Sequence, residues 1–202
     1  MSAGGRPAVA QPESFTFTAE NLERAGAFIA RYPEGKQQSA VLAILDLAQR
    51  QHQGWLPRAA MVTVAELLGM ARIRVYEVVT FYSMFNLAPV GEHHVRVCTT
   101  TPCQLRGAGE VLASCEKALG VSLGENSADG KFTLGEVECL GACVNAPVLQ
   151  IGDDYYEDLD GESATAILEA LKRGETPTPG PQGTRRTSSP ASGPKTLLEA
   201  SG

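Results

Sequence analysis

Four cysteines arranged in two pairs are the residues of this chain best suited to chemistry. Cys98 and Cys103 have the spacing C-x4-C, and Cys139 and Cys143 have the spacing C-x3-C. Iron in a 2Fe–2S cluster is bound by thiolates, two on each iron, so two pairs on separate segments meet the requirement of one cluster. The spacing therefore favours one 2Fe–2S cluster, whose cofactor-binding and metal-ligating residues are Cys98, Cys103, Cys139 and Cys143.

Two other interpretations of the same cysteines stay open at this point. Zinc also accepts four cysteines in a tetrahedral site, although structural zinc pairs usually have two intervening residues. On that interpretation the chain is a zinc-stabilised interaction module without a redox role. A thioredoxin-like redox protein would use Cys98 and Cys103 as a disulfide, but the usual C-x-x-C motif does not occur in the sequence.

The surroundings of the cysteine pairs fit a cluster. Gly141 lies inside the second pair, where the backbone must approach sulfur closely and a side chain would obstruct it. The segment Thr99 to Thr101 follows Cys98 and offers hydroxyl and N–H donors to sulfur, which help to set the reduction potential of a cluster. The fifth cysteine, Cys115, lies on the apolar side of an expected helix and is interpreted as a buried structural thiol.

Two further motifs are interpreted as lacking a role in chemistry. Residues 106–109 read Arg-Gly-Ala-Gly, but Leu112 stands where the third glycine of the dinucleotide motif G-x-G-x-x-G belongs. FMN and NADH are therefore not expected on this chain itself. His93 and His94 would point to opposite faces of a strand, and both are expected to be solvated residues at a strand edge. No acid, base or nucleophile stands out, so no catalytic residue is assigned.

The elements that must position the cysteines begin with a helical half. The pattern of apolar residues predicts a helix capped by Thr18, a second over 38–51 and a fourth that ends before Pro89. Thr63 and Glu66 form a capping box, which predicts that the third helix opens there. Four short helices with brief connections predict a small helical bundle.

The second half of the sequence mixes strand and helix patterns. The expected strands cover 94–98, 132–137, 147–151 and a segment from 155, and the expected helices cover 105–119 and 161–172. Strand, helix, hairpin and a closing helix are typical of a layered α/β or α+β domain. The fold class predicted for the whole chain is therefore α/β, with the helical bundle first.

Composition and the ends of the chain complete the outline. The 202 residues are 43% hydrophobic and carry a formal net charge of -6, without the basic footprint of a nucleic-acid-binding protein. No segment reaches the ~20 apolar residues of a transmembrane helix, and the first residues lack a secretory signal. Residues 1–16 are expected to form a flexible leader. Residues 174–202, rich in Pro, Gly, Ser and Thr, are expected to be a disordered, partner-binding tail.

The cysteine segments and several others resemble the NuoE family, the 2Fe–2S subunit of NADH:quinone oxidoreductase (respiratory complex I). The resemblance covers roughly residues 17–172. It is carried by Cys98-Thr-Thr-Thr-Pro-Cys103, Glu138-Cys-Leu-Gly-Ala-Cys143, Asn145-Ala-Pro147, Gly54-Trp55 and Glu77-Val-Val-Thr-Phe-Tyr-Ser-Met-Phe85.

The resemblance implies a helical bundle domain over 17–90 and a thioredoxin-like 2Fe–2S ferredoxin domain over 91–173, with a cis Ala146–Pro147 bond. It implies an electron-transfer subunit without a complete active site of its own. Its partners would be the flavoprotein subunit that binds FMN and NADH and the other peripheral-arm subunits of complex I. The alternative is the same module in an NAD-linked formate dehydrogenase or hydrogenase. The implied location is cytoplasmic, peripheral to the inner face of the bacterial plasma membrane through the complex and not inserted in it.

Overall fold

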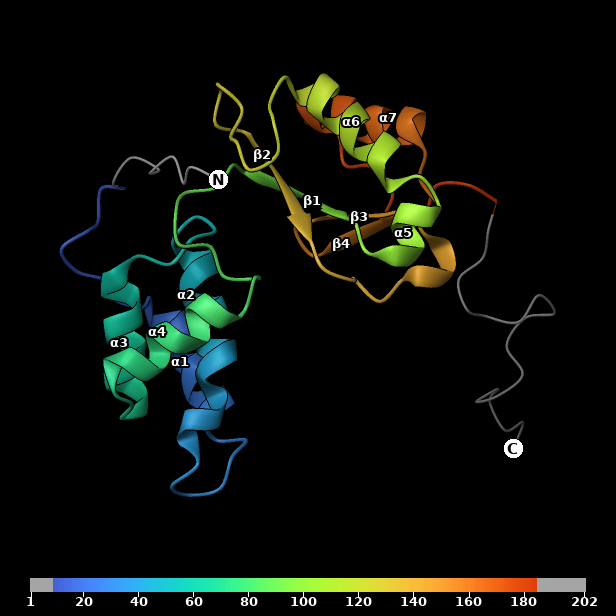
Figure 1. Cartoon of the computed structure of the whole chain (residues 1–202). Helices are drawn as coiled ribbons and strands as arrows, with labels where there is room; N and C mark the ends of the chain where they lie inside the picture. The colour runs from blue at the N-terminus through green and yellow to red at the C-terminus, as the bar shows by residue number, and fades with distance from the viewer. Residues whose placement is uncertain (1–8, 185–202) are drawn as a thin grey trace, which may run out of the picture. The chain divides into compact units, whose positions relative to one another are not determined.

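The chain divides into two compact units, with the boundary between Val90 and Gly91 (Figure 1). The structure is a computed structural model and describes residues 9–184 of the chain. The first unit is helical and the second is built on a mixed sheet, and each is considered by itself. None of the helices in residues 9–184 combines the length and the apolar character that crossing a membrane requires.

The described part of the first unit is a bundle of short helices. They are α1 (Ala19–Ile29), η1 (Gln37–Ala40), α2 (Val41–Gln51), α3 (Arg58–Leu68) and α4 (Arg72–Phe81). Thr18 caps α1 as predicted, because its hydroxyl accepts a hydrogen bond from the N–H of Asn21 at 3.2 Å. Fully buried Ile44, Leu45 and Val64 belong to the apolar core of the bundle.

The start of α3 corrects the sequence-based expectation. The helix begins at Arg58, directly after Pro57, so the prediction that Thr63 and Glu66 open it is wrong. The Thr63 hydroxyl instead donates to the carbonyl oxygen of Ala59 at 3.2 Å, a bond that threonine commonly makes one turn back inside a helix. The local pattern S/T-x-x-E is therefore present without its capping role.

Part of the expected leader is fixed to the bundle. The Thr63 hydroxyl shares its single hydrogen between the carbonyl oxygens of Ala59 and Phe15, the latter being the closer at 2.9 Å. The N–H of Arg58 donates to the side-chain oxygen of Gln11 at 2.9 Å. The expectation of a flexible leader over 1–16 is therefore not met for residues 9–16. Residues 1–8 lie outside the described part of the chain.

The second unit is a five-stranded sheet with helices. Its elements are β1 (His93–Cys98), α5 (Thr101–Leu105), α6 (Ala108–Leu119), β2 (Phe132–Val137), η2 (Cys143–Asn145), β3 (Val148–Ile151), β4 (Asp154–Glu157), α7 (Gly161–Lys172) and β5 (Gly180–Pro181). The strand order among the described residues is β2-β1-β3-β4-β5. Strand β1 is parallel to β2 and antiparallel to β3, and β3 and β4 form an antiparallel hairpin. The ranges of β2 and α7 agree with the sequence prediction.

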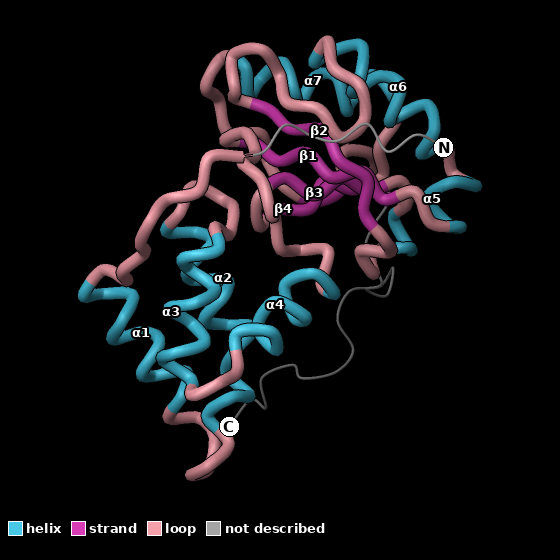
Figure 2. The backbone as a smooth tube through the Cα atoms, turned by 60° about the vertical axis from the view of Figure 1, so that its left-hand side comes forward, coloured by secondary structure: helices cyan, strands magenta, loops and turns pink. Residues whose placement is uncertain are grey.

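Helices α6 and α7 lie side by side on one face of this sheet (Figures 1 and 2). Alternate residues of the strands, among them Val95, Val97 and Leu134, are fully buried in the core that the two helices share. The helix predicted over 105–119 begins later, at Ala108, because Gly107 adopts φ +100, and the separate short helix α5 precedes it. At the β2 edge, Asn126 bridges to Thr133 in antiparallel fashion.

The environment of the two histidines also differs from the expectation. The prediction of solvated residues at a strand edge is wrong, because β1 lies between β2 and β3 and both side chains are half-buried. Burial, and after it the charge of Arg96, lowers the pKa of His94 to about 4. The Arg96 guanidinium lies 3.3 Å from Nδ1 of His94.

The first residues of the expected tail continue the sheet. Gly180 and Pro181 pair in parallel with β4, and the N–H of Gln182 donates to the carbonyl oxygen of Glu157 at 2.8 Å. The Tyr156 hydroxyl donates to the carbonyl oxygen of Pro177 at 3.4 Å. The expectation of disorder is therefore not met for residues 174–184. Residues 185–202 lie outside the described part of the chain.

Candidate iron–sulfur site

The sheet brings the ends of two cysteine-bearing strands to one edge. Cys98 is the last residue of β1, and it pairs with Val137, the last residue of β2. Because the two strands are parallel, Cys139 follows β2 at the same end at which Cys98 ends β1. Cys143 opens the turn that leads into β3, which runs antiparallel to β1 and so starts at this same end. All four cysteines predicted as ligands therefore gather at one end of the sheet.

The first pair is buried. Cys98 and Cys103 are each 1% exposed and pack with Ala108, Ala146 and Val148. Cys103 lies in the short helix α5 and not on a loop. The C-x4-C spacing alone does not predict this helix. The fold thus shields this pair from water.

The second pair lies at the surface. Cys139 is exposed and Cys143 is half-buried, and their Sγ atoms are 3.3 Å apart. This separation exceeds the roughly 2.05 Å of a disulfide bond. Gly141 between them has φ +82, and an added Cβ would meet no atom within 4 Å. The position therefore needs glycine for its left-handed backbone, and not for the steric reason expected from the sequence.

Hydrogen bonds connect the two cysteine segments. Burial acts to raise the pKa of Cys98, but bonds from the Thr100 hydroxyl and from the backbone of Leu140 and Thr100 lower it overall. Hydrogen bonds from the backbone of Gly141, and then from Cys143 and the Thr100 side chain, lower the pKa of Cys139. A residue of each segment thus contacts a sulfur of the other, and these donors favour the thiolate form that binds metal.

Cys103 links the pairs electrostatically. Burial, and after it the neighbouring thiol of Cys98, raises the pKa of Cys103 to about 12, and Cys143 acts in the same direction. Thiolates that disfavour one another in this way are stabilised when a cation is bound between them. Within residues 9–184, no three His, Cys, Asp or Glu side chains are arranged to hold a single ion. Two pairs of thiols at one end of the sheet suit a centre with two irons, each bound by two thiolates.

Cys115 stays apart from this group. It lies in α6, is fully buried in the core between that helix and the sheet, and is surrounded by apolar residues. Burial, and after it the nearby charge of Glu116, raises the pKa of Cys115 to about 12. The interpretation of Cys115 as a structural thiol agrees with this position.

Asn145 is a site residue whose role was not predicted from the sequence. It is fully buried directly after Cys143 and Val144, and its Nδ2 donates to a carboxylate oxygen of Glu157 at 2.8 Å. The backbone carbonyl oxygen of Asn145 accepts a hydrogen bond from the N–H of Asp158 at 2.6 Å. These bonds fix the second cysteine segment to the end of β4. The following Ala146–Pro147 bond is cis, as expected.

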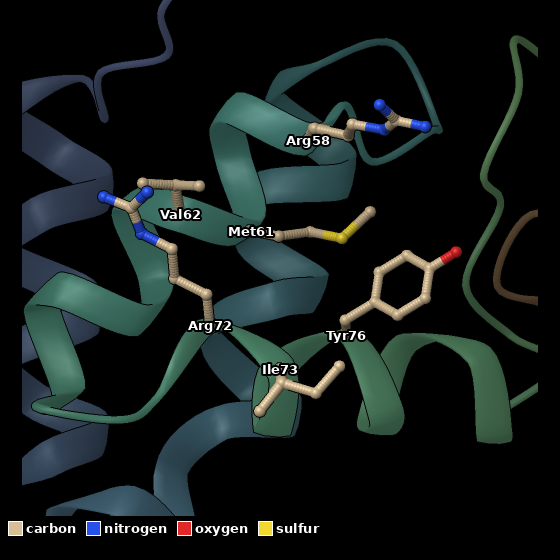
Figure 3. Close-up of a pocket in the computed structure, with 6 residues that line it drawn as sticks. All are labelled: Arg58, Met61, Val62, Arg72, Ile73 and Tyr76. Atoms are coloured by element: carbon tan, nitrogen blue, oxygen red, sulfur yellow. The ribbon is translucent and has the colours of Figure 1, made fainter.

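A pocket in the first unit is separate from the cysteines. It has a volume of about 320 Å³ and opens between α3 and α4 (Figure 3). It is lined by apolar side chains and two arginines, namely Arg58, Met61, Val62, Arg72, Ile73 and Tyr76. None of these six residues offers a thiolate, so the pocket is not the place of an iron centre.

The fold and the cysteine arrangement define a class of protein. Residues 25–172 match a family described as thioredoxin-like [2Fe-2S] ferredoxin, and the chain belongs to this family. The thioredoxin-like 2Fe–2S fold class predicted from the sequence is thereby confirmed.

Individual relatives are more specific. The chain is 56% identical over 159 residues to a subunit of the NADH-quinone oxidoreductase of Rickettsia conorii, covering 79% of this chain and 95% of the relative. It is 49% identical over 185 residues to the mitochondrial NADH dehydrogenase [ubiquinone] flavoprotein 2 of Dictyostelium discoideum, covering 92% of this chain and 75% of the relative. By their names, these homologues are subunits of an oxidoreductase complex, and they confirm the predicted resemblance to the NuoE family.

A solved structure shares the fold. An NAD+-reducing [NiFe]-hydrogenase in the air-oxidized state aligns with a TM-score of 0.57 and 19% sequence identity. The alignment covers 66% of this chain but 23% of the hydrogenase chain. At this identity the similarity concerns the fold alone.

Proposed function

We propose that this chain is the electron-transfer subunit of an NADH:quinone oxidoreductase and holds one 2Fe–2S cluster on Cys98, Cys103, Cys139 and Cys143. The observation that carries the proposal is the gathering of these cysteines, in two pairs, at one end of a sheet in a 2Fe–2S ferredoxin family. When bound, such a cluster accepts and returns one electron at a time.

The chain itself contributes ligands, burial and hydrogen bonds. Cys98 and Cys103 hold one side of the site in the packed interior, while Cys139 and Cys143 present the other side towards the surface. The Thr100 hydroxyl and the backbone N–H of Leu140 support the thiolate of Cys98. This asymmetry gives a partner protein access to the side held by the second pair and excludes water from the other.

The proposed partner is the flavoprotein subunit that binds FMN and NADH, together with other peripheral-arm subunits. Relatives named as subunits of NADH-quinone oxidoreductase support this assignment. Through that complex the chain would lie in the cytoplasm at the inner face of the bacterial plasma membrane. The module of an NAD-linked formate dehydrogenase or hydrogenase has less support, since the similarity to the hydrogenase is at 19% identity.

The decisive experiment is an absorption spectrum of the purified chain, with iron, acid-labile sulfide and zinc analysis. A 2Fe–2S protein is red-brown, bleaches on reduction and contains two irons and two sulfides per chain. A colourless protein with one zinc per chain would support the zinc-stabilised module instead. A metal-free protein with a Cys98–Cys103 disulfide would support a thioredoxin-like redox protein.

A further inference from the structure

Thr100 stands at the N-cap position of α5, but its side chain does not cap the helix. It is the N-cap residue of α5, with the extended backbone of such a position (φ -74, ψ 168), yet its side chain makes no capping hydrogen bond. A threonine there ordinarily accepts a bond from an N–H of the first turn. Thr18 does so at the start of α1, at 3.2 Å from the N–H of Asn21. The same residue type in the same position therefore serves a different purpose at Thr100.

The Thr100 hydroxyl faces sulfur instead. Its Oγ1 lies 3.4 Å from Sγ of Cys98. The same side chain is one of the hydrogen-bond partners that lower the pKa of Cys139. Thr100 thus contacts one cysteine of the buried pair and one cysteine of the surface pair. A hydroxyl carries a single hydrogen, so it donates to one of these sulfurs at a time.

We propose that Thr100 is a positioning residue of the cluster site, whose hydroxyl donates a hydrogen bond to the ligand sulfur of Cys98 and raises the reduction potential of the cluster. This inference rests on the proposed function. One-electron reduction makes the cluster and its sulfur ligands more negative, with the electron supplied by the flavoprotein partner. A donor to sulfur stabilises the more negative state more strongly, because hydrogen bonds to charged acceptors are the stronger ones.

The test compares three variants of the full chain with the unaltered protein. Thr100→Val keeps the shape of the side chain and removes the hydroxyl, and Thr100→Ser restores a hydroxyl. Thr101→Val is the matched control, because Thr101 is exposed at the first residue of α5. The readouts are iron content, the midpoint potential from a spectroscopic redox titration, and the iron–sulfur stretching frequencies. A merely structural role for the threonine would leave the last two readouts unchanged in protein of full iron content.

Thr100→Val should shift the midpoint potential to more negative values and alter the stretching frequencies. Thr100→Ser should return both towards the original values, and Thr101→Val should leave both in place. An unchanged potential in Thr100→Val, with the cluster present, overturns the inference while the proposed function stands. If Thr100→Val does not retain the cluster, Thr100→Ala provides the second variant without a hydroxyl, and the same comparison with Thr100→Ser decides. An unaltered chain that binds no iron overturns the proposed function and this inference with it.

Discussion

Cys103 and Cys115 are both buried thiols whose pKa burial raises to about 12, but they differ in their neighbours. Cys103 has the sulfur-bearing residues Cys98 and Cys143 beside it, whereas Cys115 has apolar side chains of the α6 and sheet core around it. A high pKa is therefore no guide to the role of either thiol. The presence of other thiols nearby separates a candidate ligand from a packing residue.

The effect of single cysteine substitutions on iron content should differ between the four proposed ligands and Cys115. Changing any of Cys98, Cys103, Cys139 or Cys143 to Ala should remove the cluster or sharply reduce the iron content, because each iron needs two thiolates. Cys115→Ala is the matched control and should retain all iron. Iron and sulfide analysis of the five purified variants measures this. Loss of iron in Cys115→Ala, with any of the other four tolerated, would contradict the assignment.

The same Cys115→Ala variant should be less stable. The thiol fills space in a closely packed core and is fully buried, so its removal leaves a small cavity. We expect a loss of about 1–3 kcal/mol in the free energy of unfolding. Urea unfolding followed by circular dichroism measures it, and Cys115→Val tests whether refilling the space recovers stability. A stability equal to that of the unaltered protein would mean that the core relaxes around the missing sulfur.

His94 should make the stability of the protein depend on pH. An unfolded histidine has a pKa of about 6.5, whereas burial and then Arg96 lower the pKa of folded His94 to about 4. Between these values the unfolded chain binds a proton that the folded chain does not. The contribution of His94 is therefore present above about pH 6.5 and is lost as the pH falls towards about 4. Its size is at most about 3 kcal/mol, less a reduction for partial exposure.

Urea unfolding at several pH values between these limits checks this expectation. His94→Gln should flatten the decline of stability with falling pH. His93→Gln, at the neighbouring position of β1, should leave that decline in place, since His94 is retained. An equal decline in His94→Gln and in the unaltered protein would show that another group is responsible.

Truncation after Thr184 tests the proposed role of residues 185–202. The cluster spectrum should stay unchanged, because all four proposed ligands lie upstream. Co-purification with the flavoprotein subunit should weaken. We expect Leu197 and Leu198 to be the apolar anchors of this tail and Arg185 and Arg186 the polar ones, because a few residues supply most of the binding energy of such a segment. Leu197→Ser with Leu198→Ser in the full-length chain is the matched control for chain length. If the truncated chain assembles as well as the intact one, the tail has no anchoring role.

The features that could be predicted from the sequence are those that a pattern within a short segment indicates. A short segment that opens with the buried residues Phe132, Thr133 and Leu134 forms β2 over 132–137. An amphipathic pattern with apolar residues at helical spacing defines α7 over 161–172. The spacing of the cysteines identified which thiols belong together. Each of these signals is contained in a few consecutive residues, so it survives without knowledge of the remaining fold.

The features that sequence missed depend on distant parts of the chain. The prediction of a strand edge for His94 is wrong because the residues of β1 carry no signal that β2 and β3 lie on both sides of that strand. Gln49, a polar residue only 9% exposed, is buried in α2 because its amide bonds the backbone of Met84 at 3.1 Å and of Asn86 at 2.8 Å. Neither environment has a signal in the neighbouring sequence. The sequence predicted hydroxyl donors to sulfur somewhere in Thr99 to Thr101, and the structure places the hydroxyl of Thr100 3.4 Å from Sγ of Cys98.

The pairing of β5 with β4 has a consequence for association between copies of this protein. The outer side of an edge strand carries unpaired N–H and C=O groups, which another chain can use as a template for aggregation. Gly180 and Pro181 cover part of that side of β4, and Pro181 has no N–H to offer to a further strand. A chain truncated after Arg173 lacks β5, so the edge of β4 would be exposed and the chain should self-associate. A chain truncated after Thr184 retains β5 on that edge and should not self-associate in this way.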